Sequence, residues 1–250
     1  SKITKHFETV EFSTQKREFK TETGIYKGKR ITVQSTGIGP DNIDIVMNEL
    51  DALVNIDLHT RELKPNHTAL NIVRIGTSGS LQADIPVDSW VMSKYAIGLD
   101  NMLRSYLIEE HSDSELEDAF IAHTNWDIKK GRPTVVSCEE SLENKIYSER
   151  FHKGFTGTVG GFYGPQGRVV RLNIQDPELN HKMDTFNYNG TRMTNLEMET
   201  SAIYGLGKLL GHNCLSLNAI IANRAVGEFS SNPEKTVNEL IAYTLDKLVG

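Results

Sequence analysis

The sequence predicts an α/β fold in which apolar strands alternate with amphipathic helices. Residues 30–35 have the composition of a strand and run into a glycine turn, after which residues 42–53 place apolar side chains at helical spacing. Residues 70–75 form a second apolar strand, which is again followed by a glycine turn. A β-α-β order with glycine turns after the strands is typical of a layered α/β domain.

The rest of the chain continues this alternation. We expect helices at residues 114–123, 141–153, 199–210 and 233–249, and strands at residues 154–162 and 214–222. Gly211 follows the third of these helices directly and is expected to end it. No internal repeat, low-complexity tract or linker divides the chain, so residues 1–250 are predicted to form one domain.

Composition excludes several classes of protein. The chain has 27 Lys and Arg against 33 Asp and Glu, a net charge of -6, which does not favour a nucleic acid or an anionic membrane as partner. Only two cysteines occur, which is typical of a reducing compartment, and no apolar run is long enough to span a bilayer. We therefore expect a cytoplasmic protein. The eight histidines show no metal-ligand spacing, so no metal site is predicted.

Arg74-Ile75-Gly76-Thr77-Ser78-Gly79 ends the second strand with an arginine, hydroxyl groups and two glycines. Glycines let backbone amides approach a phosphate, and a guanidinium can fork onto its oxygens. The segment therefore indicates an anion site. Taken alone, it is equally compatible with a solvated arginine beside an ordinary glycine turn.

A second segment, Gly164-Pro165-Gln166-Gly167-Arg168, follows Phe162 and Tyr163. Gln166 offers a donor and an acceptor, and Arg168 offers donors only, so the pair can match a planar edge of two carbonyls flanking an N–H. Phe162 can form an apolar wall beside it. A solvated loop with charges is the simpler interpretation of this segment by itself.

Two further segments carry polar groups next to buried elements. Glu197 and Glu199 precede the helix at residues 199–210 and could bind the hydroxyls of a ribose. Thr194 and Glu197 have the spacing of a capping box, which makes Glu199 the better ligand candidate. The alternative is that both are surface acids at a helix N-terminus. Asn223-Arg224 ends the strand at residues 214–222, where the alternative is a pair of side chains facing water.

In their residues and in their order along the chain, these segments together resemble the nucleoside phosphorylase family, in its uridine phosphorylase branch. The matching stretches lie between Arg17 and the C-terminal region and comprise residues 35–39, 74–79, 162–168, 197–199 and 221–224. The resemblance implies a single three-layer α/β/α domain with a central mixed, partly barrel-like sheet.

The resemblance also implies roles for individual residues. Arg74 and Thr77 would bind phosphate, together with Arg17 of an R-E-F segment, which would reach the phosphate site of a neighbouring subunit. The base would be bound by Gln166, Arg168, Phe162 and Gly79, with Arg224 acting through water. The ribose would be held by Glu199, Met198 and Glu197.

The activity implied is the phosphorolysis of uridine to uracil and ribose 1-phosphate. Inorganic phosphate would be a co-substrate, and no cofactor or metal is implied. The smallest functional unit would be a homodimer, and some family members are hexamers. Three alternatives stay open: a purine nucleoside phosphorylase, a nucleosidase that uses water, and an inactive nucleoside-binding homologue. Purine-cleaving relatives carry an aspartate where this sequence has Asn223.

One part of the family pattern is not matched. The family opens with a strand that ends in G-D-P-x-R, and the sequence begins after that point. We expect either a truncated chain or a domain without this part of the phosphate site.

Overall fold

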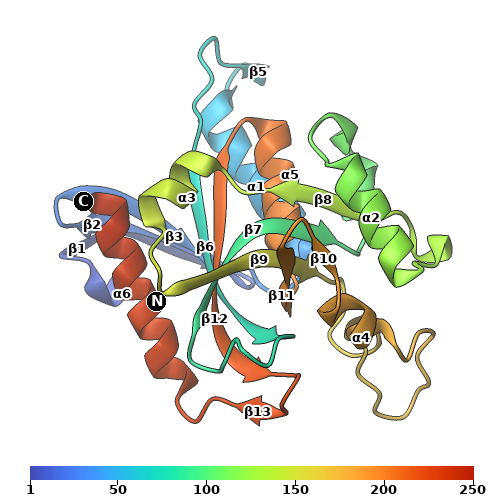
Figure 1. Cartoon of the computed structure of the whole chain (residues 1–250). Coiled ribbons are helices and arrows are strands. Elements are labelled where there is room, and N and C mark those ends of the chain that lie inside the picture. The colour runs from blue at the N-terminus through green and yellow to red at the C-terminus, as the bar shows by residue number, and fades with distance from the viewer.

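A computed structural model describes all 250 residues (Figure 1). Its strands are β1 (Thr9–Lys16), β2 (Phe19–Tyr26), β3 (Lys29–Gln34), β4 (Ile56–Asp57), β5 (Glu62–Leu63), β6 (Asn71–Ser80), β7 (Trp90–Gly98), β8 (Thr134–Ser137), β9 (Phe151–Thr158), β10 (Asn187–Tyr188), β11 (Thr191–Glu197), β12 (Asn213–Asn223) and β13 (Glu228–Phe229). Its α-helices are α1 (Pro40–Asn55), α2 (Ser114–Thr124), α3 (Glu140–Ile146), α4 (Leu179–Asp184), α5 (Thr200–Leu210) and α6 (Pro233–Val249). A short 3₁₀ helix, η5, covers Gly164–Gln166.

The central sheet closes on itself. Its strand order is β13-β12-β6-β11-β9-β7-β8, and an additional pairing of β12 with β7 joins the two sides. Strands β12, β6, β11, β9 and β7 therefore form a ring. β12 is parallel to β6 but antiparallel to β7, and β11 is parallel to β9 but antiparallel to β6. The prediction of a mixed, partly barrel-like sheet is confirmed.

Helices pack on both sides of this sheet. α5 contacts α1 and strands β7 and β12, and their apolar residues join those of α3 and α6 in one buried cluster that includes Met47, Leu206 and Leu217. α2 and α4 pack on each other and belong to a second cluster around Phe120 and Phe155. The three-layer arrangement predicted by the resemblance is thus present. No helix of the structure has both the length and the apolar character needed to cross a membrane.

Most of the predicted helices and strands are confirmed at nearly the expected bounds. α2, α5, α6 and β12 lie where the apolar patterns place them, and Gly211 ends α5 with a φ of 72°. A left-handed residue is easily supplied by glycine, which explains why the helix stops there.

Other predictions need correction. The helix expected at residues 141–153 is wrong in its second half, because α3 ends at Ile146 and β9 begins at Phe151. Phe151 and Lys153 pair with β7, so sheet pairing overrides local helix preference there. The glycine segment 76–79 is not a turn after a strand, because β6 continues through it to Ser80. Its glycines lie inside the sheet, in register with β12.

The N-terminal strands β1, β2 and β3 form a separate sheet. Of these, the sequence predicted only β3, as the strand at residues 30–35. β1, β2 and β3 form an antiparallel meander. All eight residues of β1 are exposed, so β1 has no buried face that an apolar alternation could have indicated.

Tyr204 links α5 to the ring and gives a test of the packing. Its fully buried hydroxyl donates to the Ser93 carbonyl at 2.6 Å and accepts from the Ser216 amide at 2.8 Å. We expect Tyr204→Phe to lower the free energy of unfolding by about 2 kcal/mol, because it leaves a buried amide without an acceptor. Tyr26, whose hydroxyl donates to Asp246 at the surface, provides the matched control, and Tyr26→Phe should change stability far less. Urea unfolding of both variants measures the difference, and equal losses would contradict this account.

Candidate active site

Three of the predicted phosphate and ribose residues, Arg74, Glu197 and Glu199, meet where β6, β11 and β12 lie side by side. Arg74 comes from β6, Glu197 is the last residue of β11, and Glu199 directly precedes the first residue of α5. Arg74 Nη2 lies 2.6 Å from Glu199 Oε2 and 3.1 Å from Glu197 Oε2. The structure therefore brings these three charged side chains into one cluster.

The inner side of the Arg74 guanidinium faces β12. Nη1 donates to Asn218 Oδ1 at 2.9 Å and lies 3.4 Å from Ser216 Oγ. Burial alone lowers the pKa of Arg74, but the charges of Glu197 and Glu199 outweigh it and raise that pKa above its ordinary value. A Cβ at Gly76 would lie 2.4 Å from Nη1, so a side chain at that position would displace the guanidinium from its present place.

Sequence reasoning missed Asn218 and Ser216. They lie two residues apart in the otherwise apolar strand β12, and both are fully buried. Because residues at this spacing point to the same side of a strand, two polar residues in an apolar run were a signal that something polar faces them.

Glu197 has a second role, which corrects one prediction. Its carboxylate accepts hydrogen bonds from the Glu199 amide at 2.9 Å and from the Thr200 amide at 3.0 Å. It also accepts from Thr158 Oγ1 at 2.7 Å. Glu197 thus satisfies the first amides of α5. The predicted capping box with Thr194 is wrong, because Thr194 lies within β11 and donates to the Phe155 carbonyl.

Glu199 joins the cluster to the loop before α1. Its Oε1 accepts from the Gly39 amide at 2.8 Å, while Oε2 pairs with Arg74. Asp100 lies near Glu197. Burial raises the pKa of Asp100, and the charges of Glu197 and Asp41 raise it further. The guanidinium of Arg74 itself is paired with two carboxylates, those of Glu197 and Glu199.

The predicted base-binding residues form a second cluster. Gln166 is 2% exposed, and its Oε1 accepts from Arg168 Nη1 at 2.6 Å and from Arg224 Nη2. Arg224 Nη1 also donates to the Gln166 carbonyl at 3.1 Å. Because guanidinium groups only donate, they fix the amide oxygen of Gln166 toward them.

Phe162 and Gly79 adjoin this second cluster. The Arg168 Cζ lies 4.0 Å from the centroid of the Phe162 ring, and residue Phe162 is 53% exposed. A Cβ at Gly79 would lie 3.1 Å from Arg224 Nε, so the strand approaches that side chain closely. Burial, and then the charge of Arg168, lowers the pKa of Arg224 to about 10. Burial also lowers the pKa of Arg168.

The remaining predicted residues are not held in either cluster. Thr77 is exposed in β6, and Met198 is half-buried between β11 and α5. Arg17 is exposed at the turn between β1 and β2, with a φ of 54°. That turn is tied to the segment before α1, since Ser35 Oγ donates to the Glu18 carbonyl at 2.5 Å.

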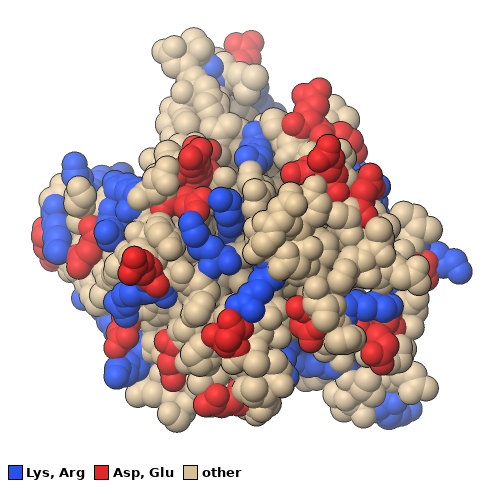
Figure 2. All heavy atoms as spheres, in the orientation of Figure 1, with Lys and Arg blue, Asp and Glu red and all other residues tan.

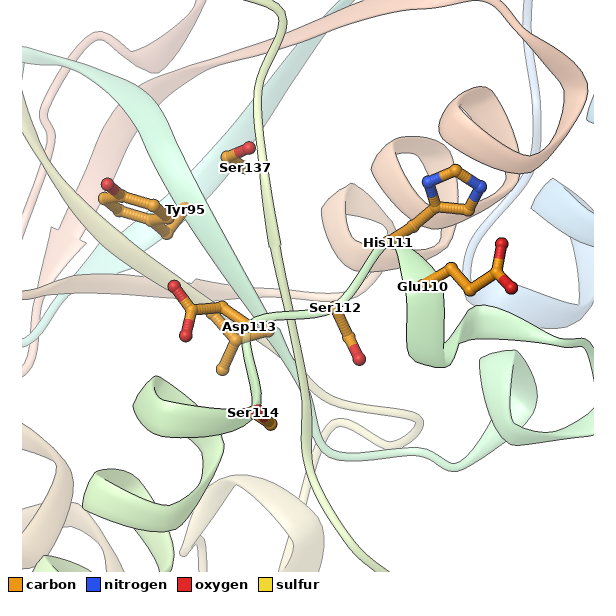
Figure 3. A pocket seen from close by; sticks show the side chains of 8 residues that line it. Tyr95, Glu110, His111, Ser112, Asp113, Ser114 and Ser137 are labelled. Carbon is orange, nitrogen blue, oxygen red and sulfur yellow. The ribbon is translucent and has the colours of Figure 1, made fainter.

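A hollow of about 350 Å³ lies elsewhere, beside β7, β8 and the start of α2 (Figure 3). It is lined by Tyr95, Glu110, His111, Ser112, Asp113, Ser114, Val135 and Ser137. No Lys or Arg lines it, and none of the predicted site residues does. Asp113 is engaged in capping α2 through the Leu116 amide. The hollow therefore lacks the cations that a phosphate site requires.

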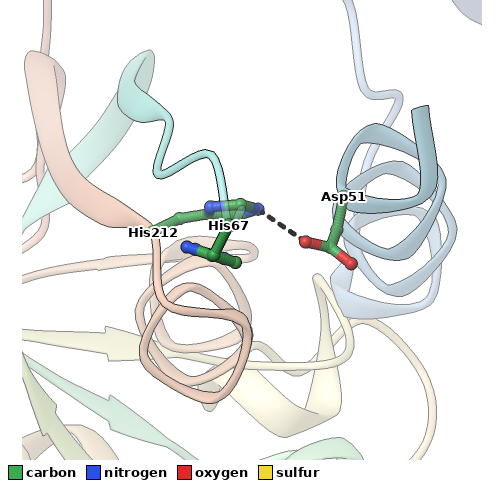
Figure 4. Close-up of side chains that lie close together, drawn as sticks. All are labelled: Asp51, His67 and His212. Carbon is green, nitrogen blue, oxygen red and sulfur yellow. Dashed lines mark ion pairs between the residues drawn. The ribbon is translucent and has the colours of Figure 1, made fainter. Parts of the chain in front are cut away.

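Asp51, His67 and His212 come close enough together to be examined as a metal site (Figure 4). His212 Nε2 lies 3.4 Å from Asp51 Oδ1. However, the Leu70 amide donates to His212 Nδ1 at 3.3 Å, which places the ring proton on Nε2 in the neutral imidazole. The lone pair that a metal would need is then absent from the nitrogen nearest Asp51. Burial lowers the pKa of His212, in keeping with a neutral ring.

Charges of both signs are interspersed on the face of the molecule shown in Figure 2. Lys and Arg form no continuous track there. The three arginines of the two clusters, Arg74, Arg168 and Arg224, are partly buried.

Comparisons with known proteins show which family the chain belongs to. The chain is 29% identical over 226 residues to a uridine phosphorylase of Thermococcus kodakarensis, covering 88% of this chain and 67% of that protein. It is 28% identical over 232 residues to a DeoD-type purine nucleoside phosphorylase of Bacillus thuringiensis, covering 91% and 79%.

Solved structures share the fold. A Trypanosoma brucei nucleoside phosphorylase with uridine phosphorylase activity superposes with a TM-score of 0.86 at 28% identity, covering 99% of this chain and 89% of that one. A uridine phosphorylase of Phytophthora capsici, at 19% identity and a TM-score of 0.67, supports the fold alone. The model of the phosphorylase superfamily matches residues 1–249. This chain therefore belongs to the phosphorylase superfamily and is an enzyme of the nucleoside phosphorylase type.

Proposed function

We propose that this enzyme cleaves uridine with inorganic phosphate, giving uracil and ribose 1-phosphate. The observation that carries the proposal is the buried Gln166 amide held between the guanidiniums of Arg168 and Arg224. Uracil presents O2, N3–H and O4 along one edge. When a uracil carbonyl takes the donors of Arg168, Gln166 Oε1 becomes free to accept from N3–H, while its NH₂ donates to the other carbonyl.

A purine substrate is the main alternative, given the similarity to a DeoD-type purine nucleoside phosphorylase. A purine site needs a group that can donate a proton or hydrogen bond to N7. Asn223 stands at the position in question, but its amide donates to the Gln82 and Ile85 carbonyls at 2.9 Å. Its oxygen accepts from the Ala225 and Val226 amides. Because Asn223 is used by its own loop, the geometry favours a pyrimidine.

In this proposal the ribose and phosphate lie at the Arg74 cluster. Arg74 and Thr77 bind phosphate, Glu199 and Met198 bind the ribose, and Glu197 holds Arg74 and α5 in place. The carboxylates around Arg74 would repel a phosphate dianion, so a second cation is needed. The exposed Arg17 of a neighbouring subunit supplies it in a homodimer. Catalysis then consists of positioning the reactants and stabilising charge at both ends of the breaking bond, without a cofactor or metal.

The first test separates a phosphorylase from a nucleosidase and from an inactive homologue. Full-length protein should release uracil from uridine only when phosphate or arsenate is present, because the Arg74 cluster holds an anion rather than a water nucleophile. Product analysis by chromatography with and without phosphate measures this. Equal uracil release in phosphate-free buffer would identify a nucleosidase, and no release under either condition would identify an inactive homologue.

The second test concerns the neighbouring subunit. Arg17→Ala chains and Arg74→Ala chains should each be nearly inactive alone, because each loses a charge-assisted contact worth about 1.5–3 kcal/mol. Mixed under conditions of subunit exchange, they form hybrid dimers in which one site has both arginines, and activity should partly return. An exchanged mixture as inactive as its two components would show that Arg17 does not act across an interface.

The third test concerns the base. Arg168→Ala should lower kcat/KM for uridine by about 10- to 100-fold, because a charge-assisted hydrogen bond to the departing base is lost. Arg171→Ala, which removes an exposed arginine from the same loop, is the matched control and should leave kcat/KM unchanged.

Substrate choice completes this test. Cytidine should be cleaved far more slowly than uridine, by roughly 10⁴-fold in a favourable case, because its amino group faces donors. Steady-state kinetics with uridine, cytidine and inosine measures these ratios. Efficient cleavage of inosine would overturn the pyrimidine assignment.

A further inference from the structure

The ring of five strands encloses a belt of polar side chains, one from each strand. These are Asn218 of β12, Ser93 of β7, Thr156 of β9, Asn195 of β11 and Ser78 of β6. The first four are fully buried, and Ser78 is 6% exposed. A barrel of this size would ordinarily fill its interior with apolar side chains. Five buried polar groups therefore call for an explanation.

Hydrogen bonds join the belt without a gap. Asn218 Nδ2 donates to Ser93 Oγ at 3.1 Å, and Ser93 Oγ lies 2.6 Å from Thr156 Oγ1. Thr156 donates to Asn195 Oδ1 at 2.8 Å, and Asn195 Nδ2 donates to Ser78 Oγ at 2.7 Å. Ser78 then donates to the Leu196 carbonyl at 2.8 Å.

The groups at the two ends of the belt determine which atom donates in each of its hydrogen bonds. Arg74 can only donate, so the oxygen of Asn218 must face it and the NH₂ of Asn218 must face Ser93. Ser93 then accepts from Asn218 and donates to Thr156. The Leu196 carbonyl, at the other end, can only accept. Only one arrangement of protons satisfies every group, and in that arrangement the amide of Asn218 cannot turn over without breaking the belt.

Asn218 and the two carboxylates bind different nitrogens of the Arg74 guanidinium. Nη2 donates to Glu199 and forms an ion pair with Glu197, and Nη1 donates to Asn218 at 2.9 Å. Ser216 Oγ, at 3.4 Å, is a poorer acceptor for Nη1. Arg74 Nε makes no hydrogen bond within the protein and keeps its donor. Without Asn218 the guanidinium would be held from the carboxylate side alone.

We propose that Asn218 is a positioning residue that, through the belt, fixes the plane of the Arg74 guanidinium for phosphate. The inference rests on the proposed role of Arg74 in phosphate binding. It extends that role to the side chains of Ser93, Thr156, Asn195 and Ser78, which do not form hydrogen bonds with Arg74.

Asn218→Leu tests the inference, because leucine has a similar volume and no acceptor. In full-length enzyme it should raise KM for phosphate by about 10-fold, the effect of removing a hydrogen bond to a charged group, and leave KM for uridine within about twofold. Asn55 is the matched control. It is also a buried asparagine, and its amide bonds Asp51 Oδ1 and the Thr68 carbonyl and accepts from the Thr68 amide, away from the cluster. Asn55→Leu should lower the unfolding temperature without changing KM for phosphate.

Two further variants exclude a merely structural effect. In an Arg74→Lys background, adding Asn218→Leu should change kcat/KM for phosphate by less than about twofold, because the residues act as one unit. Ser93→Ala removes a single hydroxyl that does not contact Arg74, and it should also raise KM for phosphate, by a smaller factor. It provides the test if Asn218→Leu does not fold.

The outcomes separate this inference from the proposed function. A wild-type enzyme that does not use phosphate refutes the proposed function. A phosphate-dependent wild type whose Asn218→Leu and Ser93→Ala variants keep the wild-type KM for phosphate refutes the inference alone. Equal rises of KM for phosphate and for uridine would also overturn it, because a general loosening of the site would then suffice.

Discussion

The charge of the Arg74 guanidinium is buried where three strands of the closed sheet meet, and much of the surrounding structure compensates it. An unpaired charge in such a place would cost several kcal/mol. Glu197 and Glu199 neutralise it on one side, and Asn218 satisfies it on the other. Gly76 provides the space for the guanidinium, since any side chain at that position would collide with it.

This compensation also anchors two helices. Glu197 accepts from the first amides of α5, where a negative charge is favoured by the helix dipole. Glu199 accepts from the Gly39 amide, directly before α1. The entry of both helices is therefore tied to the same ion cluster, so that displacing Arg74 would disturb the elements that carry the carboxylates. A rigid support of this kind is what positioning catalysis demands.

The two clusters of the candidate site differ in charge. The cluster of Arg74, Glu197 and Glu199 is rich in carboxylates, and the cluster of Gln166, Arg168 and Arg224 contains two guanidiniums without an acid. Cleavage of a nucleoside develops positive charge on the ribose and negative charge on the departing base. In the proposed arrangement, acids beside the ribose and arginines beside the base would stabilise both charges at once. Burial lowers the pKa of Arg224, and the nearby charge of Arg168 lowers it further.

The sequence by itself determined the helices α2, α5 and α6 and the strand β12, because these depend on apolar periodicity. The resemblance of its short motifs to a known family singled out the residues of both clusters. The sequence could not determine which of these residues meet. The contact of Arg74 with Asn218 spans 144 positions, and that of Gln166 with Arg224 spans 58. Only the closure of β12 onto β7 places Ser93 and Thr156 on the same interior as Asn195. The tertiary structure likewise decided that Glu197 caps α5 without Thr194, because β11 runs to Glu197 and keeps Thr194 in its ladder. Local patterns record which face of an element is buried, whereas the partner on the other side depends on how distant strands pair.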